Sequence, residues 1–226
     1  MSAIKRQRGI AYLTTLIALP VLGALIGGAI QLGLLFHAKL VLNYAVLHAA
    51  RAGAHGNALA PKISDGLIQG LKPLYVSDQS YESLTTEAYV RAKQDVEINS
   101  CIKVLNPSQE AFVDFDVTLA DPLRDNTIAY YELDNLPATP GVASGVSIQQ
   151  AMNLQVYVLY GARAEVPLIG PLITAILLRL TKGSSIRQGM LARNRVPIEA
   201  HAFVRMSSNA KLSTIVAAKG TGKYSC

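Results

Sequence analysis

Tryptophan is absent from this 226-residue chain, and cysteine occurs only twice, as Cys101 and Cys226. Neither cysteine has the CxxC or CxxH spacing of a zinc site, so the sequence predicts no structural zinc. In an oxidising compartment a disulfide between the two would join the C-terminal tail to the domain, and two unpaired thiols are the alternative. The lack of tryptophan, of a stacking motif and of clustered positive charge argues against nucleic-acid binding.

Acidic residues are missing from positions 1–64, which hold six Lys and Arg residues. Positions 65–165 hold fourteen acidic residues against six basic ones, whereas positions 166–226 hold nine basic residues against one acidic residue. The chain thus has an acidic middle and a basic end. This segregation indicates either electrostatic pairing, within the protein or with a neighbouring subunit, or two solvated faces.

Recognisable catalytic motifs are missing as well. The chain has no Gly-x-Ser-x-Gly, no HExxH and no nucleophile–base arrangement. The glycine-rich stretch 220–223 lacks the first glycine and the Ser or Thr of a phosphate-binding loop. His37, His48 and His55 share one face of a predicted helix, but they lie about 16 and about 10 Å apart along its axis, too far to bind one metal.

Two carboxylates, Asp114 and Asp116, share one face of a predicted strand. Such a pair could form a cation site or an acid–base pair, but a solvated outer strand face is the simpler interpretation, because the residues alternating with them are apolar. We therefore expect a protein that is not an enzyme and that uses no cofactor and no metal.

The chain does have a long apolar opening. A basic leader at 1–9 runs into an uncharged stretch at 10–36. At about 1.5 Å per residue, one helix of this length crosses a hydrocarbon core of about 30 Å. The stretch is longer than the core of a secretory signal, and the nearest small-x-small site follows Lys39 and Arg51, so we expect a retained anchor. The basic leader favours an N-terminus in the cytoplasm.

Several residues inside this predicted transmembrane helix are suited to helix packing. Gly23 and Gly27 form a GxxxG pattern, which lets helix backbones approach closely in lipid, although glycine is also simply common in transmembrane helices. Pro20 removes one backbone hydrogen bond and can kink the helix. Gln31 is the only amide side chain of the stretch and could bond to a neighbouring helix.

Helical spacing of apolar residues continues over 37–56 and ends at a Gly56-Asn57 stop signal. Residues 57–226 then form an extracytoplasmic domain with a loose C-terminal tail. Its pattern predicts an α+β domain, an antiparallel sheet of about four strands with helices packed on one side. The predicted helices run from Ser64 to Leu71 and from Tyr81 to Gln94, and the predicted strands cover 96–104, 113–119, 154–158 and 198–206.

Two connecting segments of this domain carry specific expectations. Asn106-Pro107-Ser108 is predicted to be a hairpin loop, and the Pro- and Gly-rich segment 136–145 another loop. The apolar run 167–180 is too short to be a convincing second membrane span. A core helix, an interfacial helix lying on the bilayer and a partner-binding surface are its three alternatives.

Four short motifs of the N-terminal region carry a family resemblance. They are Arg8-Gly9, the run LIALP at 16–20, Gln31-Leu32-Gly33 and, most specifically, the ending AARAGA at 49–54. In these residues the chain resembles the TadE/TadG-like minor pseudopilins of the tight-adherence (Flp, type IVb) pilus system. The resemblance covers about the first 55 residues.

The resemblance implies a single-pass protein of the bacterial inner membrane, with a cytoplasmic N-terminus and a periplasmic domain. It implies contacts with the lipid bilayer, with other pilins or pseudopilins and with the inner-membrane pilus assembly platform. Pilin-like relatives are cut by a prepilin peptidase after the leader glycine, which here would separate Gly9 from Ile10. They usually carry Glu five residues after the cut, where this chain has Thr14, and a threonine hydroxyl cannot neutralise the new N-terminal amine of a neighbour.

Three alternatives to a cleaved minor pseudopilin remain. The protein could be an uncut anchor, or an accessory pseudopilin of a type II secretion-like system. It could also be a membrane-tethered ligand-binding domain or enzyme, for which a deep polar pocket with convergent titratable groups would be the sign.

Overall fold

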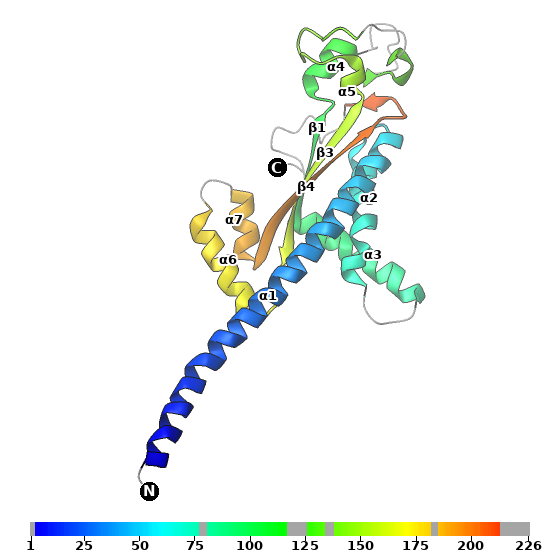
Figure 1. Cartoon of the computed structure of the whole chain (residues 1–226). Helices are drawn as coiled ribbons and strands as arrows, with labels where there is room; N and C mark the ends of the chain where they lie inside the picture. The colour runs from blue at the N-terminus through cyan, green and yellow to red at the C-terminus, as the bar shows by residue number, and fades with distance from the viewer. Residues whose placement is uncertain (1–2, 77–80, 117–125, 134–137, 182–184, 213–226) are drawn as a thin grey trace. The chain divides into compact units, whose positions relative to one another are not determined.

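The computed structural model describes residues 3–76, 81–116, 126–133, 138–181 and 185–212 (Figure 1). The chain divides into two compact units, which are described in turn. The first combines Met1–His37 with Ala162–Val196, and the second combines Ala38–Gly161 with Pro197–Cys226. The two segments of each unit are far apart in the sequence.

A single helix, α1 (Ala3–His55), contributes to both units. Its 53 residues contain one proline, Pro20, which lies inside the helix. The helix ends where expected, because Asn57 and Ala58 adopt positive φ angles of 60° and 54°. The N–H of Ala58 then donates to the carbonyl oxygen of Gly53 at 2.9 Å, which satisfies one of the last helical carbonyl groups.

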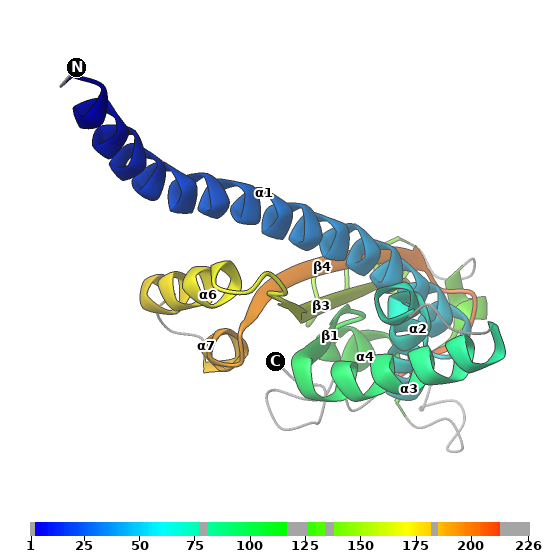
Figure 2. The same cartoon turned by 90° about the horizontal axis from the view of Figure 1, so that it is seen from below.

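The first unit adds two shorter helices to α1, namely α6 (Ile169–Leu180) and α7 (Ser185–Ala192). The predicted apolar run 167–180 is thus mostly helix α6. Both views show α6 beginning beside α1 (Figures 1 and 2). Asn194, with a φ of 57°, ties this unit together: its side chain accepts from the Thr174 hydroxyl at 2.9 Å and donates to the Ala164 carbonyl oxygen at 3.2 Å.

The helices of the second unit are packed through small residues. They are α2 (Ala60–Leu71), the 3-10 helix η1 (Lys72–Tyr75) and α3 (Tyr81–Asn99). Helix α2 begins four residues before the expected Ser64, because Pro61 occupies its first turn, where a missing N–H costs nothing. A Cβ atom on Gly66 would lie 2.9 Å from the Cα of Ala49, so the alanine-rich end of α1 meets the glycines of α2 at close range.

The main sheet has three strands in the order β1-β3-β4, formed by β1 (Ser100–Asn106), β3 (Asn153–Arg163) and β4 (Arg195–Arg205). Strands β1 and β3 are antiparallel, with Ile102 opposite Val158. A second, two-stranded antiparallel sheet pairs β2 (Thr127–Ile128) with β5 (Ala210–Lys211). The α+β class and the strands expected at 154–158 and 198–206 are confirmed. Short helical elements complete the described chain: α4 (Gln109–Phe115), η3 (Tyr130–Leu133) and α5 (Ile148–Ala151).

The strand expected at 113–119 is wrong where the structure describes it. Residues 113–115 belong to helix α4, which begins after Ser108, whose hydroxyl accepts the N–H of Ala111. In this helix Phe112 is buried and Val113 is exposed, so the alternation of Val and Phe with Asp reflects a short helix. Residues 117–119 lie outside the described part of the chain.

Two boundaries around β1 also differ from the expectation. Segment 106–108 leads from β1 into α4 and is not a hairpin loop. Val96 and Ile98, expected in a strand, belong to the last turns of α3, where Val96 is fully buried. The expected loop at 136–145 has no helix or strand from residue 138 onward, and its first two residues, like the predicted loose tail, lie outside the described residues.

Candidate functional site

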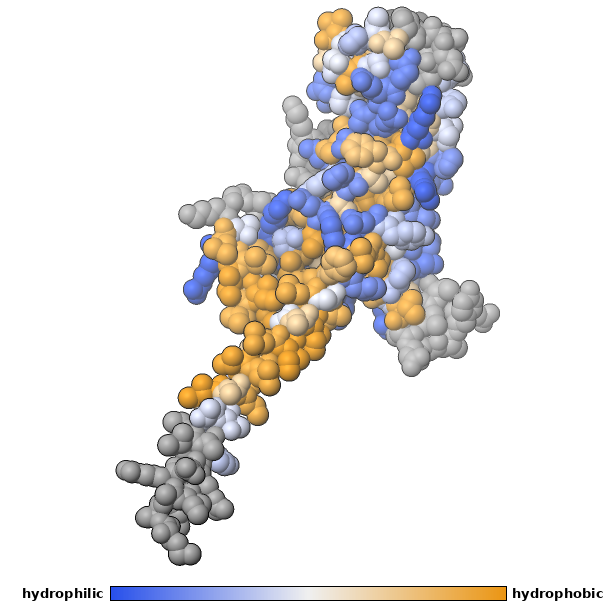
Figure 3. All heavy atoms as spheres, in the orientation of Figure 1, coloured by the Kyte–Doolittle hydropathy of each residue, from blue (hydrophilic) through white to orange (hydrophobic). Residues whose placement is uncertain are grey.

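The first half of α1 exposes large apolar side chains. Nine of them between positions 16 and 32 are more than half exposed: Leu16, Ile17, Leu19, Val21, Leu22, Leu25, Ile26, Ile30 and Leu32. No charged residue occurs between Thr14 and Phe36. A contiguous apolar surface of this kind marks contact with lipid or with another protein (Figure 3).

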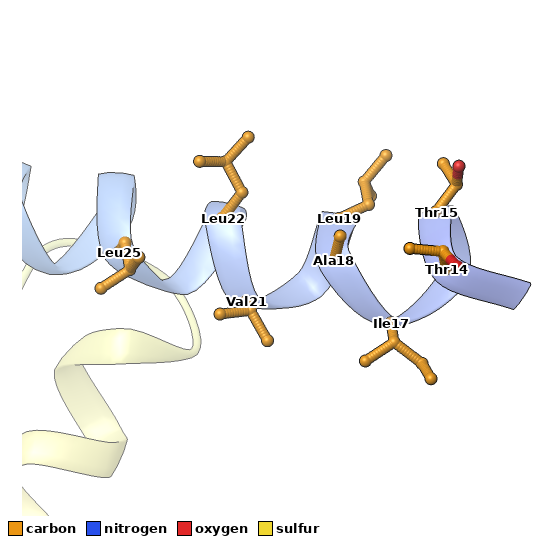
Figure 4. Close-up of a pocket in the computed structure, with 8 residues that line it drawn as sticks. All are labelled: Thr14, Thr15, Ile17, Ala18, Leu19, Val21, Leu22 and Leu25. Carbon is orange, nitrogen blue, oxygen red and sulfur yellow. The ribbon is translucent and has the colours of Figure 1, made fainter. Parts of the chain in front are cut away.

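This surface is that of one helix. The eight side chains labelled in Figure 4, which lie between Thr14 and Leu25, project outward from α1. The eight described residues that line the hollow drawn there all belong to α1, so the hollow is a shallow groove along the side of one helix. Among the described residues, α1 is the one helix long and apolar enough to cross a membrane, over Thr14–His55.

Two of the predicted helix-packing residues, Gly27 and Gln31, lie against the segment 166–169. A Cβ atom on Gly27 would lie 3.0 Å from Cγ1 of Ile169, at the start of α6. Gln31 is fully buried, and its Oε1 accepts the N–H of Val166 at 2.9 Å, while its Nε2 has no hydrogen-bond partner among the residues that the structure describes. Gln31 thus bonds to a segment of its own chain, a partner that sequence spacing alone does not reveal.

The other packing candidates lie elsewhere on α1. A Cβ atom on Gly23 would have nothing within 4 Å, so Gly23 and Gly27 do not share a neighbour within the described chain. Gly9 and Ile10, the residues around the predicted cleavage, are helical residues near the start of α1. Cleavage between them stays a prediction.

Of the two cysteines, the structure describes Cys101 alone. Cys101 lies in β1, is almost fully buried and takes part in a disulfide. Cys226 lies outside the described residues. The predicted link between the C-terminal tail and the domain therefore stays a prediction.

A buried polar cluster lies in the second unit, at residues for which no sequence motif indicated a site. Asp95 of α3 is 4% exposed, and its Oδ2 accepts hydrogen bonds from the hydroxyls of Tyr75 and, at 2.6 Å, Tyr160. Its Oδ1 accepts from the amide of Asn99 at 2.9 Å. Burial raises the pKa of the Tyr75 hydroxyl, and its contacts with Tyr160 and Asp95 raise it further.

The available signal for this cluster was the spacing of Asp95 and Asn99. They lie four residues apart on the face of α3 that also buries Ala92 and Val96. A polar pair on an apolar helix face needs partners from elsewhere in the fold. Here η1 and β3 supply them, so the cluster joins three elements of the second unit and serves as a structural cross-link.

The histidines and carboxylates singled out in the sequence bind separate partners. Nδ1 of His48 lies 3.1 Å from the Gly66 carbonyl oxygen, and Nδ1 of His55 lies 2.6 Å from the Ser207 hydroxyl. Within the described residues, no three His, Cys, Asp or Glu side chains come together as metal ligands do. His37 belongs to the first unit, whereas His48 and His55 belong to the second.

Asp114 and Asp116 do not share a strand face, which corrects that expectation. Asp114 lies in α4 and accepts the N–H of Ser144 at 2.7 Å and that of Ala143 at 2.9 Å. Hydrogen bonds from Ser144 and Ala143 lower the pKa of Asp114. Asp116 instead accepts the N–H of Thr127 at 3.1 Å. Each carboxylate therefore holds a different segment of backbone.

Comparison with known proteins bears on the N-terminal helix. The family model of TadE-like proteins matches residues 15–51. No curated protein and no solved structure matches the chain. The match covers the exposed apolar half of α1 and continues into the part that packs against α2. The resemblance seen in the sequence is thereby confirmed over residues 15–51, which are similar to TadE-like proteins.

Proposed function

We propose that this protein is a membrane-anchored minor pseudopilin or assembly protein of a Tad pilus, and that it acts through protein contacts without catalysing a reaction. The observation that carries the proposal is the coincidence of the TadE-like match with a change in burial along α1. Within residues 15–51, the segment before Gln31 is largely exposed and apolar, whereas Leu42, Val46 and Ala49 are fully buried.

This change in burial fits an anchor that continues into a domain. Lipid replaces water around the exposed half, where every backbone N–H and C=O is already satisfied within the helix. The buried half packs against α2 through the glycines of that helix. One uninterrupted helix therefore supplies both the membrane contact and part of the folded domain.

Orientation and partners follow from the leader and the exposed face. The leader holds Lys5, Arg6 and Arg8, which favour a cytoplasmic N-terminus and a periplasmic domain. Gly23 has open space around it, which suits close approach by the helix of another pilin or of the assembly platform. Prepilin peptidase is a further candidate partner, with its cut after Gly9.

Photo-crosslinking in native membranes tests these contacts. A photoreactive residue in place of Leu22, on the exposed half of α1, is expected to capture pilus membrane components. The matched control replaces Val142, a fully exposed loop residue of the second unit. Crosslinking of Leu22 variants to lipid alone, together with normal piliation when the gene is deleted, would contradict the proposal.

A further inference from the structure

Helix α6 exposes large apolar side chains along its outer side. Its sequence, IGPLITAILLRL, is almost entirely apolar, yet the only buried residues of α6 are Gly170 and Thr174. Leu172, Ile176 and Leu180 are each at least half exposed. A surface helix of a soluble protein turns its large apolar side chains toward the core and its small or polar ones toward water. Helix α6 is instead apolar on both sides: Ile169, Ile173 and Leu177 are half-buried on its inner side, and large apolar side chains are also exposed on its outer side.

The exposed residues form one face. Leu172, Ile176 and Leu180 follow one another at four-residue steps, which places them on one side of the helix; they are called the outer face below. The Thr174 hydroxyl lies on the inner side, where it donates to Asn194 at 2.9 Å. The three residues of the outer face offer water no polar group, and the exposed Arg179, seven residues after Leu172, lies at the end of this face.

The position of α6 along α1 matches the edge of a membrane. The uncharged run 10–36 is about 40 Å long as a helix, whereas a hydrocarbon core is about 30 Å thick, so about seven residues are left over. Gly27 and Gln31, which contact Ile169 and Val166, lie near the end of that run. Helix α6 thus begins near the level at which α1 leaves the hydrocarbon.

The apolar surface of α6 continues onto that of α1 within this unit (Figure 3). The charge around it also suits a membrane surface. Positions 162–196 hold six basic residues and one acidic residue, and Arg179 in the last turn of α6 is exposed. An apolar helix face with basic residues nearby is typical of helices that lie in the interface of anionic lipid.

We propose that α6 is a second membrane-contacting element, lying in the bilayer interface with its outer face among the acyl chains and Arg179 among anionic headgroups. At about 18 Å the helix is too short to cross the bilayer. The hydrogen bond from Val166 to Gln31 ties its beginning to the anchor. This inference rests on the proposed function only in that α1 is taken as a membrane anchor.

The absence of tryptophan makes a direct test available, because one introduced tryptophan is the only one in the protein. Three full-length variants are reconstituted into phosphatidylcholine–phosphatidylglycerol vesicles that contain brominated lipids. Ile176→Trp reports on the outer face, Leu22→Trp on the anchor, and Val142→Trp on a fully exposed loop as control. All three positions are exposed, so none of the substitutions disturbs packing.

The proposal predicts blue-shifted emission for Ile176→Trp, with quenching about twofold or more stronger than for Val142→Trp and strongest with bromine near the headgroup. Leu22→Trp is quenched by bromine deeper in the chains. Adding Leu172→Lys to the Ile176→Trp variant is expected to reduce the quenching of the introduced tryptophan. Leaving phosphatidylglycerol out of the vesicles is expected to reduce this quenching as well.

Two results would overturn the proposal while leaving the anchor intact. Ile176→Trp could emit and quench like Val142→Trp while Leu22→Trp is quenched, which would show that water covers the outer face. A blue shift without quenching would show that protein, such as a second copy of the chain, covers it. If Leu22→Trp is also unquenched, the anchor fails, and the proposed function fails with it.

Discussion

A Cβ atom on Gly70 of α2 would lie 2.8 Å from the Cβ of Ala45 on α1, closer than side-chain carbons approach in folded proteins. The added Cβ atom would also meet backbone atoms of Ala45, so a rotamer change cannot relieve the overlap. The small residues at this crossing are therefore required by the close approach of the two helices.

Replacing Gly70 with alanine is expected to push α2 away from α1. Overpacking of this kind costs about 1–3 kcal/mol. Gly189→Ala is the matched control, because a Cβ there would meet only the end of the Arg193 side chain at 3.9 Å. Thermal unfolding in detergent should show a lower Tm for Gly70→Ala and an unchanged or higher Tm for Gly189→Ala. Equal Tm values for the two variants would count against the close crossing.

Removal of the Asp95 carboxylate should destabilise the second unit. In Asp95→Ala the buried hydroxyls of Tyr75 and Tyr160 lose their carboxylate acceptor, and an unsatisfied buried group costs about 1–3 kcal/mol. Tyr89→Phe is the control, because it removes an exposed hydrogen bond to Asp65. Denaturant unfolding should show a large loss of stability for Asp95→Ala and little change in stability for Tyr89→Phe. Similar midpoints for both would argue against a structural cross-link.

Alkaline pH should lower the stability of the folded state, in part through the ionisation of Tyr75. The folded state raises the pKa of this hydroxyl above the usual value of about 10, so the unfolded chain loses the proton first. The contribution of Tyr75 to stability is thus complete below about pH 10 and declines as the pH rises further. Unfolding midpoints are measured from about pH 9 to about pH 11, on both sides of the usual pKa of tyrosine. As the pH rises, they should fall less steeply for Tyr75→Phe than for the unmodified protein. Parallel curves would contradict this role.

Acid should release the loop held by Asp114. Hydrogen bonds from Ser144 and Ala143 lower the pKa of this carboxylate below its unfolded value of about 3.9. Its contribution to stability is present above that value and is lost as the pH falls toward the folded pKa. The stability difference between the unmodified protein and Asp114→Asn should therefore narrow below about pH 4. A difference independent of pH would mean that the charge of Asp114 is irrelevant.

The disulfide of Cys101 can be assigned by mass spectrometry. Protein from native membranes is alkylated without reductant and then digested. Within these 226 residues Cys226 is the other cysteine, so a peptide containing Cys101 should be found linked to a peptide containing Cys226. Alkylation of Cys226 would rule out that link and indicate a different partner for Cys101.

The parts of the fold that depend on local signals could be predicted from sequence. The end of α1 at Gly56-Asn57 is set by residues that accept a positive φ, and the strands at 154–158 and 198–206 alternate apolar residues over their full length. The strand predicted at 113–119 is wrong over residues 113–115. Period-two alternation over so few residues also fits a short helix that begins after an N-cap serine.

Contacts between distant segments could not be predicted. Tyr160 is 65 residues from the Asp95 that it binds, and Val166 is 135 residues from Gln31. Nothing in the local pattern of Gln31 distinguishes a partner within the chain from a neighbouring protein. The exposure of the apolar outer face of α6 likewise needed the structure, because its sequence is equally compatible with a core helix.

Extraction of native membranes tests most directly whether the exposed apolar half of α1 is embedded in the bilayer. Membranes containing the full-length protein are washed with alkaline carbonate and then with detergent. A protein anchored by the exposed half of α1 should stay in the membrane pellet through the carbonate wash and be released only by detergent. Release into the carbonate supernatant, or a monodisperse protein without detergent, would show that the exposed leucines and isoleucines of α1 do not contact acyl chains.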